Sequence, residues 1–598
     1  MYNLIKRLMT ILTPGQRKRF YVLQILVLIM AFVEVLGIAS IIPFMALVGD
    51  ISLLYEDSII SNMYELSGIN SESQFIFMLG ILVLITVFIS AAISMLTLWR
   101  LSMFANYVGT EIATSLYIFY IQQDWLFHAS GSSAKMTKKI ANETTRLTNL
   151  VLMPLMHVNA RSIFALILVL IVLIFDTKVA LIGFSVFFIG YLILYKLVRI
   201  RLEHNGKIIS EVYEKRFRLM SEGFGGIKDI LLLGRSKSFI DNFSLTGNNL
   251  AYSQGTNTAL AQVPRYLIEL VAFGSMIALV LYLISSFNGD LGKILPRLSA
   301  YALAAIKLLP AFQQIYLNFA LLKGNISAFE SIEKDLNEAY KAKSNQIDRL
   351  QKNLTPKQNI ALENISFRYP SKKESAINAL NINIPVNSTI GIVGSSGSGK
   401  STLIDILLGL IKPEAGFLRI DNEPIDIKNL RSWQNNIGFV PQSIFLSEGT
   451  IAENVAFGIQ NDQINLDQVN KALDLSNLKE FVQNLEKGIN TKVGERGVQL
   501  SGGQRQRIGI ARALYNKSDV LVFDEATSSL DGITEKTIME SIHKFSGKKT
   551  IIIVAHRLKT IQECDQIFFI EKGKVIDKGT FEELIEKNEK FKNMASHA

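Results

Sequence analysis

Six long apolar runs dominate the first 325 residues of this chain and then stop. They cover residues 21–48, 75–99, 163–175, 179–197, 267–286 and 298–322. Most approach or exceed the roughly 20 residues that a helix needs to cross a bilayer. The third run is short, but residues 150–159 extend it upstream past Pro154. The pattern predicts six membrane-spanning helices; a buried soluble helical domain is the alternative, but it would not need so many runs of this length.

The charges between the runs predict an orientation. The segment 49–75 contains no Lys or Arg and carries five carboxylates, whereas 100–146, 196–262 and the first 20 residues are rich in basic side chains. Basic loops stay on the cytoplasmic side. We therefore expect a multi-pass protein of the plasma (inner) membrane, with both termini inside. This bias, together with contact with anionic membrane lipids, also explains the net charge of +10, so no nucleic-acid partner is needed.

Composition agrees with a membrane half followed by a soluble half. The mean hydropathy is +0.28, and 49% of the 598 residues are hydrophobic. We expect a six-helix transmembrane domain over residues 1–325, a linker over 326–357 and an α/β domain over 358–598. The two long inside segments predict helices that continue beyond the membrane, and glycines within 222–229 predict a turn in the second. Cys564, the single cysteine, excludes an intrachain disulfide and is interpreted as structural.

The second half opens with a phosphate-binding motif of the G-x-x-x-x-G-K-[ST] type. It consists of Gly394, Ser395, Ser396, Gly397, Ser398, Gly399, Lys400 and Ser401, and Thr402 follows. An apolar strand-like run precedes it and a helix-like run follows. Backbone N–H groups of such a loop face the phosphates, Lys400 reaches the β- and γ-phosphates, and the Ser401 hydroxyl is a ligand for Mg²⁺. The motif predicts that a nucleotide binds here together with Mg²⁺.

Further motifs follow in order. They are the signature Leu500-Ser501-Gly502-Gly503-Gln504, the acidic strand end Asp524-Glu525, Gln442 after Val440-Pro441, Asp531 in Ser528-Ser-Leu-Asp531, His556 after an apolar strand, and Tyr369. Alone, His556, Gln442 and Tyr369 would be interpreted as structural. Together the motifs resemble the ABC ATPase domain, a P-loop (RecA-like) α/β fold, from about residue 360 to 590.

The resemblance implies a role for each residue. Asp524 and Gln442 would help Ser401 to hold Mg²⁺, Glu525 would polarise the attacking water, and His556 would contact the γ-phosphate. Tyr369 would stack on adenine. The signature residues 501–504 and Asp531 would act on the ATP held by a second subunit, which implies a dimer. A homodimer is expected, although a heterodimer stays open.

Membrane spans ahead of one ATPase domain resemble the half-transporter layout of ABC exporters (the type IV exporter fold). Glu495 and Arg496 match an exporter loop that contacts the intracellular helices. The spans are most similar to bacterial flippases of lipid-linked oligosaccharides, on the residues around Glu34, Val263-Pro-Arg265 and Lys307-Leu-Leu-Pro310, although Lys307 and Gln314 stand where that family has arginines. An outer surface helix is expected within 51–66.

We therefore expect an ATP hydrolase coupled to transport, which moves a lipid or lipid-linked glycan. Charged groups inside spans are costly, so Glu34, Arg265 and Lys307 are candidate cargo contacts, with helix–helix pairing as the other interpretation. Lipid A-type cargo and a peptide or drug exporter stay open. A nucleotide-gated channel is less compatible with an intact Glu525, and a soluble ABC protein of DNA repair or translation is less compatible with six spans.

Overall fold

The computed structural model divides the chain into two compact units. One contains Met1–Gln123 and Ser130–Gln346, and the other contains Asp124–Ala129 and Ile347–Ala598. The structure describes residues 2–49, 51–55, 59–69, 71–175, 177–286, 291–344, 354–370, 372–494, 497–526, 532–555 and 557–596.

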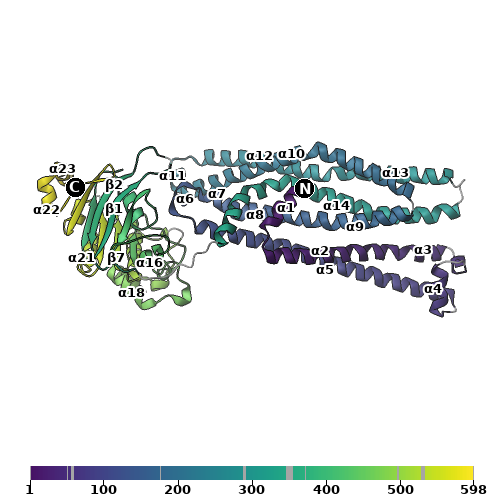
Figure 1. Cartoon of the computed structure of the whole chain (residues 1–598), viewed down its shortest axis with the longest axis horizontal. Helices are drawn as coiled ribbons and strands as arrows, with labels where there is room; N and C mark the ends of the chain where they lie inside the picture. Colours follow the sequence, from purple (N-terminus) through teal and green to yellow (C-terminus); the bar gives the residue numbers. More distant parts are fainter. Residues whose placement is uncertain are drawn as a thin grey trace. The chain divides into compact units, whose positions relative to one another are not determined.

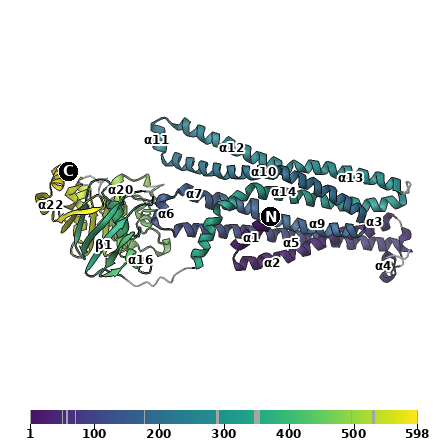
Figure 2. The ribbon, with the colours of Figure 1, turned by 45° about the horizontal axis from the view of Figure 1, so that its top comes forward.

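The first unit is helical throughout its described regular elements. Its first elements are α1 (Tyr2–Ile11), α2 (Pro14–Ala39), α3 (Ile41–Gly49), the 3₁₀ turn η1 (Ile51–Leu54), α4 (Ile59–Ser67), α5 (Glu72–Ile121) and α7 (Ser133–Lys138). The π-helical turn η2 (Lys139–Glu143), α8 (Thr144–Leu147), the π-helical turn η3 (Thr148–Leu152) and α9 (Met153–Phe175) follow. The last are α10 (Thr177–Gly225), α11 (Ile227–Leu232), α12 (Ser236–Gln262), α13 (Pro264–Ser286) and α14 (Leu291–Ser344). Within the unit α2 packs on α5, α10 on α12, and α14 on both α9 and α10 (Figures 1 and 2).

Each of the six apolar runs lies within this helical unit. Among the described residues, four helical stretches are long and apolar enough to cross a membrane: Pro14–Gly49, Glu72–Ile121, Ser133–Ile174 and Ala304–Lys341. The runs on α10 and α13 include residues whose side chains are not described, so six spans stay a prediction. The chain is a multi-pass membrane protein. Helices α5, α10 and α14 continue past their apolar runs, and α10 ends at the glycines of 222–229, where Gly226 is the N-cap of α11.

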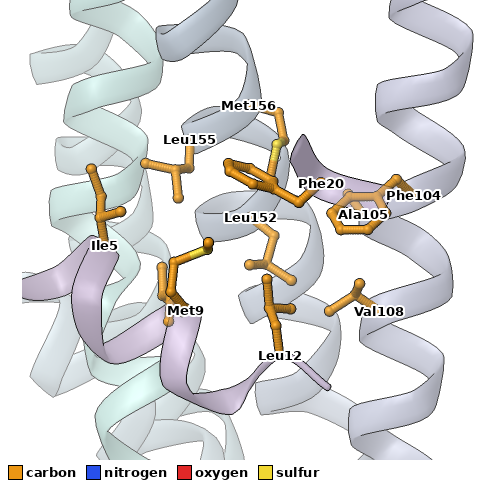
Figure 3. Close-up of a pocket in the computed structure, with 11 residues that line it drawn as sticks. Ile5, Met9, Leu12, Phe20, Phe104, Ala105, Val108, Leu152, Leu155 and Met156 are labelled. Carbon is orange, nitrogen blue, oxygen red and sulfur yellow. The ribbon is translucent and has the colours of Figure 1, made fainter. Parts of the chain in front are cut away.

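The amphipathic helix α1 packs against the bundle through one side only. Figure 3 shows Ile5, Met9 and Leu12 facing side chains of α5 and of the η3–α9 stretch around a cavity of about 30 Å³. Leu8, Ile11 and Leu12 are buried, while Lys6 and Thr10 are exposed. Burial of this apolar side fixes the start of the chain to the bundle.

A buried charged cluster lies at the π-helical turns. Glu143 is fully buried, 2.9 Å from the Arg146 guanidinium and 3.3 Å from Lys138 Nζ. Arg146 also donates to Asn325 of α14 and Ser210 of α10, so the cluster joins three helical segments. Pro154 has no N–H to donate to the preceding turn, and η3 ends directly before Met153-Pro154.

The second unit is α/β. A four-stranded antiparallel sheet has the order β2-β1-β4-β5, and a six-stranded sheet has the order β10-β9-β3-β8-β7-β6. The strands are β1 (Asn359–Phe367), β2 (Ile377–Pro385), β3 (Thr389–Val393), β4 (Ala415–Ile420), β5 (Glu423–Pro424), β6 (Ile437–Val440), β7 (Val520–Asp524), β8 (Thr550–Val554), β9 (Gln566–Glu571) and β10 (Lys574–Gly579). Strands β9, β3, β8, β7 and β6 are parallel, so their carboxyl ends share one edge.

Helices complete the second unit. They are α6 (Trp125–Ser130), which belongs to this unit up to Ala129, α15 (Lys400–Leu407), α16 (Leu430–Asn435), α17 (Ile451–Val455), α18 (Leu466–Leu475), α19 (Lys479–Gln483), α20 (Gly502–Tyr515), α21 (Gly532–His543), α22 (Phe581–Lys587) and α23 (Glu589–Ser596), with 3₁₀ turns at Asn461–Gln463, Gly488–Asn490 and Leu558–Ile561. The core of the unit contains Cys564, which is 5% exposed, and its burial raises the pKa of the thiol to about 12. A buried, protonated thiol agrees with the structural role expected for it.

The linker expected over 326–357 begins as helix, since α14 continues to Ser344. Hydrophobic residues along its last turns are buried in the first unit, for example Phe329, Ile332 and Leu336. The amphipathic pattern of this charged stretch explains why it continues the helix.

Candidate nucleotide site and membrane cavity

The phosphate-binding loop leaves the fully buried strand β3 and enters α15, as the motif predicts. Gly394 is packed so closely that a Cβ would lie 2.1 Å from the Ile570 carbonyl oxygen. Gly397 and Gly399 have φ of +77° and +106°, a region that favours glycine. The loop conformation therefore requires these glycines, and the loop leads into the N-terminus of α15, where backbone N–H groups favour an anion.

Lys400 is the first residue of α15 and contacts the loop with its side chain. Its Nζ donates to the carbonyl oxygens of Gly394 (2.8 Å) and Ser395 (3.1 Å), and the residue is 6% exposed. Burial lowers the pKa of Lys400 from its usual value, while Glu525 and Asp524 oppose that shift. The lysine is thus held among phosphate-binding groups with two carboxylates nearby.

The acidic pair ends β7, two strands from β3 in the same sheet. Gln442, which follows β6, donates from Nε2 to Glu525 Oε2 at 2.6 Å. Glu525 has φ of +50°, and its N–H continues the ladder to Val554 of β8 at 2.9 Å. The left-handed backbone is unusual for a non-glycine residue and marks a position held by its surroundings. The structure therefore brings together Lys400, Gln442, Asp524 and Glu525.

Tyr369 follows β1 and reaches the start of α15. Its hydroxyl lies 3.1 Å from Thr402 Oγ1, and its ring packs edge-on against Phe367. The structure thus places the aromatic ring beside the phosphate-binding loop.

Ser501 is the N-cap of α20. Its hydroxyl accepts from the Gln504 N–H at 3.2 Å, and its own N–H donates to Gln504 Oε1 at 2.8 Å. This capping box leaves Ser501 exposed at the positive end of a 14-residue helix. The signature therefore presents helix donors at the surface of the unit.

Asp405 is a site residue that sequence reasoning missed. It lies on α15, and burial together with the nearby Asp524 raises its pKa to about 6, partly opposed by a hydrogen bond from Trp125. No motif contains Asp405. Its position in the sequence, five residues after Lys400 on the same helix, does not reveal that Asp524 lies nearby in the fold.

His556, Asp531, Glu495 and Arg496 lie outside the described residues. Their assigned roles stay predictions.

The charged groups of the spans form two clusters in the first unit. Glu34 of α2 lies 3.4 Å from the guanidinium of Arg161 on α9, and Arg161 Nε donates to Gln314 Oε1 of α14 at 2.8 Å. Arg265 Nε donates to Glu269 at 2.7 Å on α13, and Gln313 of α14 donates to the same carboxylate at 3.2 Å. Arg161 was not predicted as a cargo contact.

Arg265 lines a cavity of about 390 Å³ together with Gln313 and Gln314. Lys307 is exposed and does not line this cavity, and Glu34 reaches it only through Arg161 and Gln314. Of the three predicted cargo contacts, the structure places Arg265 directly on the cavity.

Comparison with known proteins agrees with this geometry. The family model described as ABC transporter matches residues 377–528, which include the phosphate-binding loop, the signature and Asp524-Glu525. The second unit is an ABC transporter domain. Such a domain binds ATP.

The fold of the whole chain is shared with a solved structure described as a bacterial Atm1-family ABC exporter with ATP bound. The TM-score is 0.76 at 19% identity, covering 97% of this chain and 99% of the other. At this identity the likeness concerns the fold. The chain has the ABC exporter fold.

Curated relatives are similar over part of their length. An ATP-dependent lipid A-core flippase of Shewanella frigidimarina is 31% identical over 396 residues, which cover 63% of this chain and 65% of that protein. ABC transporter B family member 14 of Arabidopsis thaliana is 41% identical over 236 residues, 39% of this chain and 19% of that protein. The chain therefore spans less than two thirds of these relatives.

Proposed function

We propose that this chain is half of an ATP-driven exporter or flippase that moves a lipid or lipid-linked glycan across the bacterial plasma membrane. The observation that carries the proposal is the joining, in one chain, of the Lys400–Glu525 centre with a membrane unit whose cavity is lined by Arg265. The similarity to lipid A-core flippases supports a lipid as cargo.

The chemistry of the ABC domain follows from its donor set. Lys400 and the loop N–H groups would hold the phosphates, and Tyr369 would lie against the base. The Ser401 hydroxyl, Asp524 and Gln442 offer the hard oxygen ligands that Mg²⁺ prefers, and the bound ion would neutralise charge on the phosphates. Glu525 would orient the attacking water, with Gln442 holding the carboxylate at 2.6 Å.

The site is completed by a second copy of the chain. Ser501 presents the start of α20 at the surface, where its donors suit a phosphate held by a partner subunit. Apolar side chains on two surfaces support pairing between copies. Leu231, Leu232 and Leu233 at α11 are 66%, 81% and 67% exposed, and on the ABC domain Phe445 and Phe457 are 62% and 49% exposed. Exposed apolar patches of this kind mark interaction surfaces.

The expected orientation places the ABC domain and both termini in the cytoplasm. The acidic segment that contains α4 would then face outward. Hydrolysis inside would drive alternation of the membrane unit, and export follows from the ABC exporter fold.

Hydrolysis is tested with the full-length protein reconstituted in lipid. Glu525→Gln should lower the ATPase rate by about 10²–10⁴-fold, because the amide cannot polarise water, while nucleotide binding persists. Glu486→Gln makes the same change at an exposed carboxylate that belongs to none of the motifs. It is the matched control and should keep full activity. Full ATPase activity in Glu525→Gln would overturn the assignment.

A further inference from the structure

Two glutamines that line the 390 Å³ cavity are oriented by hydrogen bonds to charged residues outside its lining. Its polar lining includes Arg265 of α13 with Gln313 and Gln314 of α14, and Arg265 is the charged residue of that lining. The two adjacent glutamines each contact a charged residue of another helix. Those contacts decide what each amide presents to the cavity.

The amide of Gln314 is oriented by Arg161. Arg161 Nε lies 2.8 Å from Gln314 Oε1, and a guanidinium only donates hydrogen bonds. The carbonyl oxygen must therefore face Arg161, which turns the NH₂ group away as a donor.

The amide of Gln313 is oriented in the opposite sense by Glu269. Gln313 Nε2 lies 3.2 Å from Glu269 Oε1, and an ionised carboxylate only accepts. The NH₂ group must face Glu269, which leaves the carbonyl oxygen as an acceptor. In the part of the chain that the structure describes, neither the Gln314 NH₂ nor the Gln313 carbonyl has another recorded partner.

The charges around the cavity balance one another. Arg265 is paired with Glu269 at 2.7 Å and Arg161 with Glu34 at 3.4 Å. Arg265 uses Nε for that pair, and its side chain is 63% exposed, so its terminal nitrogens are available to one anionic group. A headgroup with several phosphates would meet two guanidinium groups that are already neutralised.

A donor, an acceptor and one guanidinium side by side match the chemistry of a polyol next to one phosphate. A hydroxyl both donates and accepts, so it satisfies Gln313 and Gln314 together. We propose that Gln313 and Gln314 form a hydroxyl-recognition pair that, with Arg265, selects lipid headgroups carrying a sugar or polyol on a single phosphate. Arg161 and Glu269 are the positioning residues. This inference rests on the proposed lipid-exporting function.

The test compares two probe lipids that are both singly charged phosphodiesters and differ in the group beyond the phosphate. Binding of phosphatidylinositol, with its polyol, and of phosphatidylmethanol, with a methyl group, to the full-length protein in detergent is titrated by native mass spectrometry. Wild type should bind phosphatidylinositol about tenfold more tightly, a difference of about 1.4 kcal/mol. Gln313→Leu with Gln314→Leu should reduce that ratio to near unity and leave the affinity for phosphatidylmethanol unchanged. Arg265→Gln should weaken both probes alike.

Three further variants separate recognition from folding. Asn318→Leu removes an amide one turn further along α14, outside the cavity lining, and should keep the wild-type ratio. In Arg161→Met the preference for phosphatidylinositol should disappear, because Gln314 is no longer oriented. Arg161→Lys keeps a hydrogen-bond donor and should retain most of that preference.

An equal affinity of wild type for both probes, or an unchanged ratio in the double leucine variant, would overturn the inference. If lipids still stimulate the ATPase in that case, the proposed function stands and only the headgroup selection fails. If no lipid of any kind binds or stimulates, the proposed function itself fails.

Discussion

At the scale of single residues, the ABC domain holds Asp405 in surroundings that favour its neutral form. Its pKa is raised from 3.8 to about 6, mainly by burial and also by Asp524. For a raised carboxyl pKa, the associated stabilisation is complete below the unfolded pKa and is lost as pH rises through the folded pKa. Wild type therefore bears the cost of the charged form above pH 6.

Asp405→Asn removes that cost. The stability difference between the variant and wild type should be larger at pH 7.5 than at pH 5.0, in favour of the variant. The increase should be about 1–2 kcal/mol after solvent screening is allowed for. Thermal unfolding of the full-length protein at the two pH values measures the difference. An identical difference at both pH values would contradict the pKa argument.

At the scale of elements, α10 and α14 approach each other closely at two glycines, Gly206 and Gly324. A Cβ on Gly206 would lie 2.4 Å from the Gly324 carbonyl oxygen, whereas a Cβ on Gly190 of the same helix would meet nothing within 4 Å. Gly206→Ala should destabilise the membrane unit by about 1–3 kcal/mol, because the helices must separate.

Gly190→Ala is the control in the same helix. It should raise stability by about 0.5–1 kcal/mol, because alanine loses less entropy in a helix. Both variants are compared with wild type by thermal unfolding in detergent. Equal effects of the two substitutions would show that the close approach is not a packing contact.

Elements were more predictable than the contacts between them. The apolar runs, the glycine turn before α11 and the strand–loop–helix at Lys400 follow from local pattern, because periodicity and glycine conformation act over a few residues. Arg161 could not be assigned, since its partners Glu34 and Gln314 lie 127 and 153 residues away in the chain. The π-helical turns and the buried Glu143 likewise depend on tertiary packing.

At the scale of the whole molecule, we propose that the exposed apolar surface at α11 contacts the ABC domain of the partner copy. Leu231→Asp with Leu232→Asp places charges on that surface, so lipid stimulation of the ATPase should be lost. Asn248→Asp with Asn249→Asp adds the same charge at exposed positions of α12 and should keep stimulation. ATPase assays with and without added lipid compare the pairs. Equal stimulation in both double variants would exclude α11 from coupling.

Oligomeric state is a separate whole-molecule prediction. Native mass spectrometry of the detergent-purified protein should show two copies of the chain. In the proposed mechanism the ATP bound at Lys400 of one copy is contacted by Ser501 of the other copy, so one copy has no complete site. A monomer that hydrolyses ATP at the full rate would contradict that mechanism.

The central claim is that hydrolysis at Glu525 moves a lipid across the membrane. The most direct measurement is movement of a fluorescent glycolipid between the leaflets of proteoliposomes that contain the full-length protein, followed by quenching with a membrane-impermeant reductant. Wild type should change the quenched fraction only when Mg²⁺ and ATP are supplied, and Glu525→Gln should not change it. Movement that is the same without ATP, or the same in Glu525→Gln, would contradict the account.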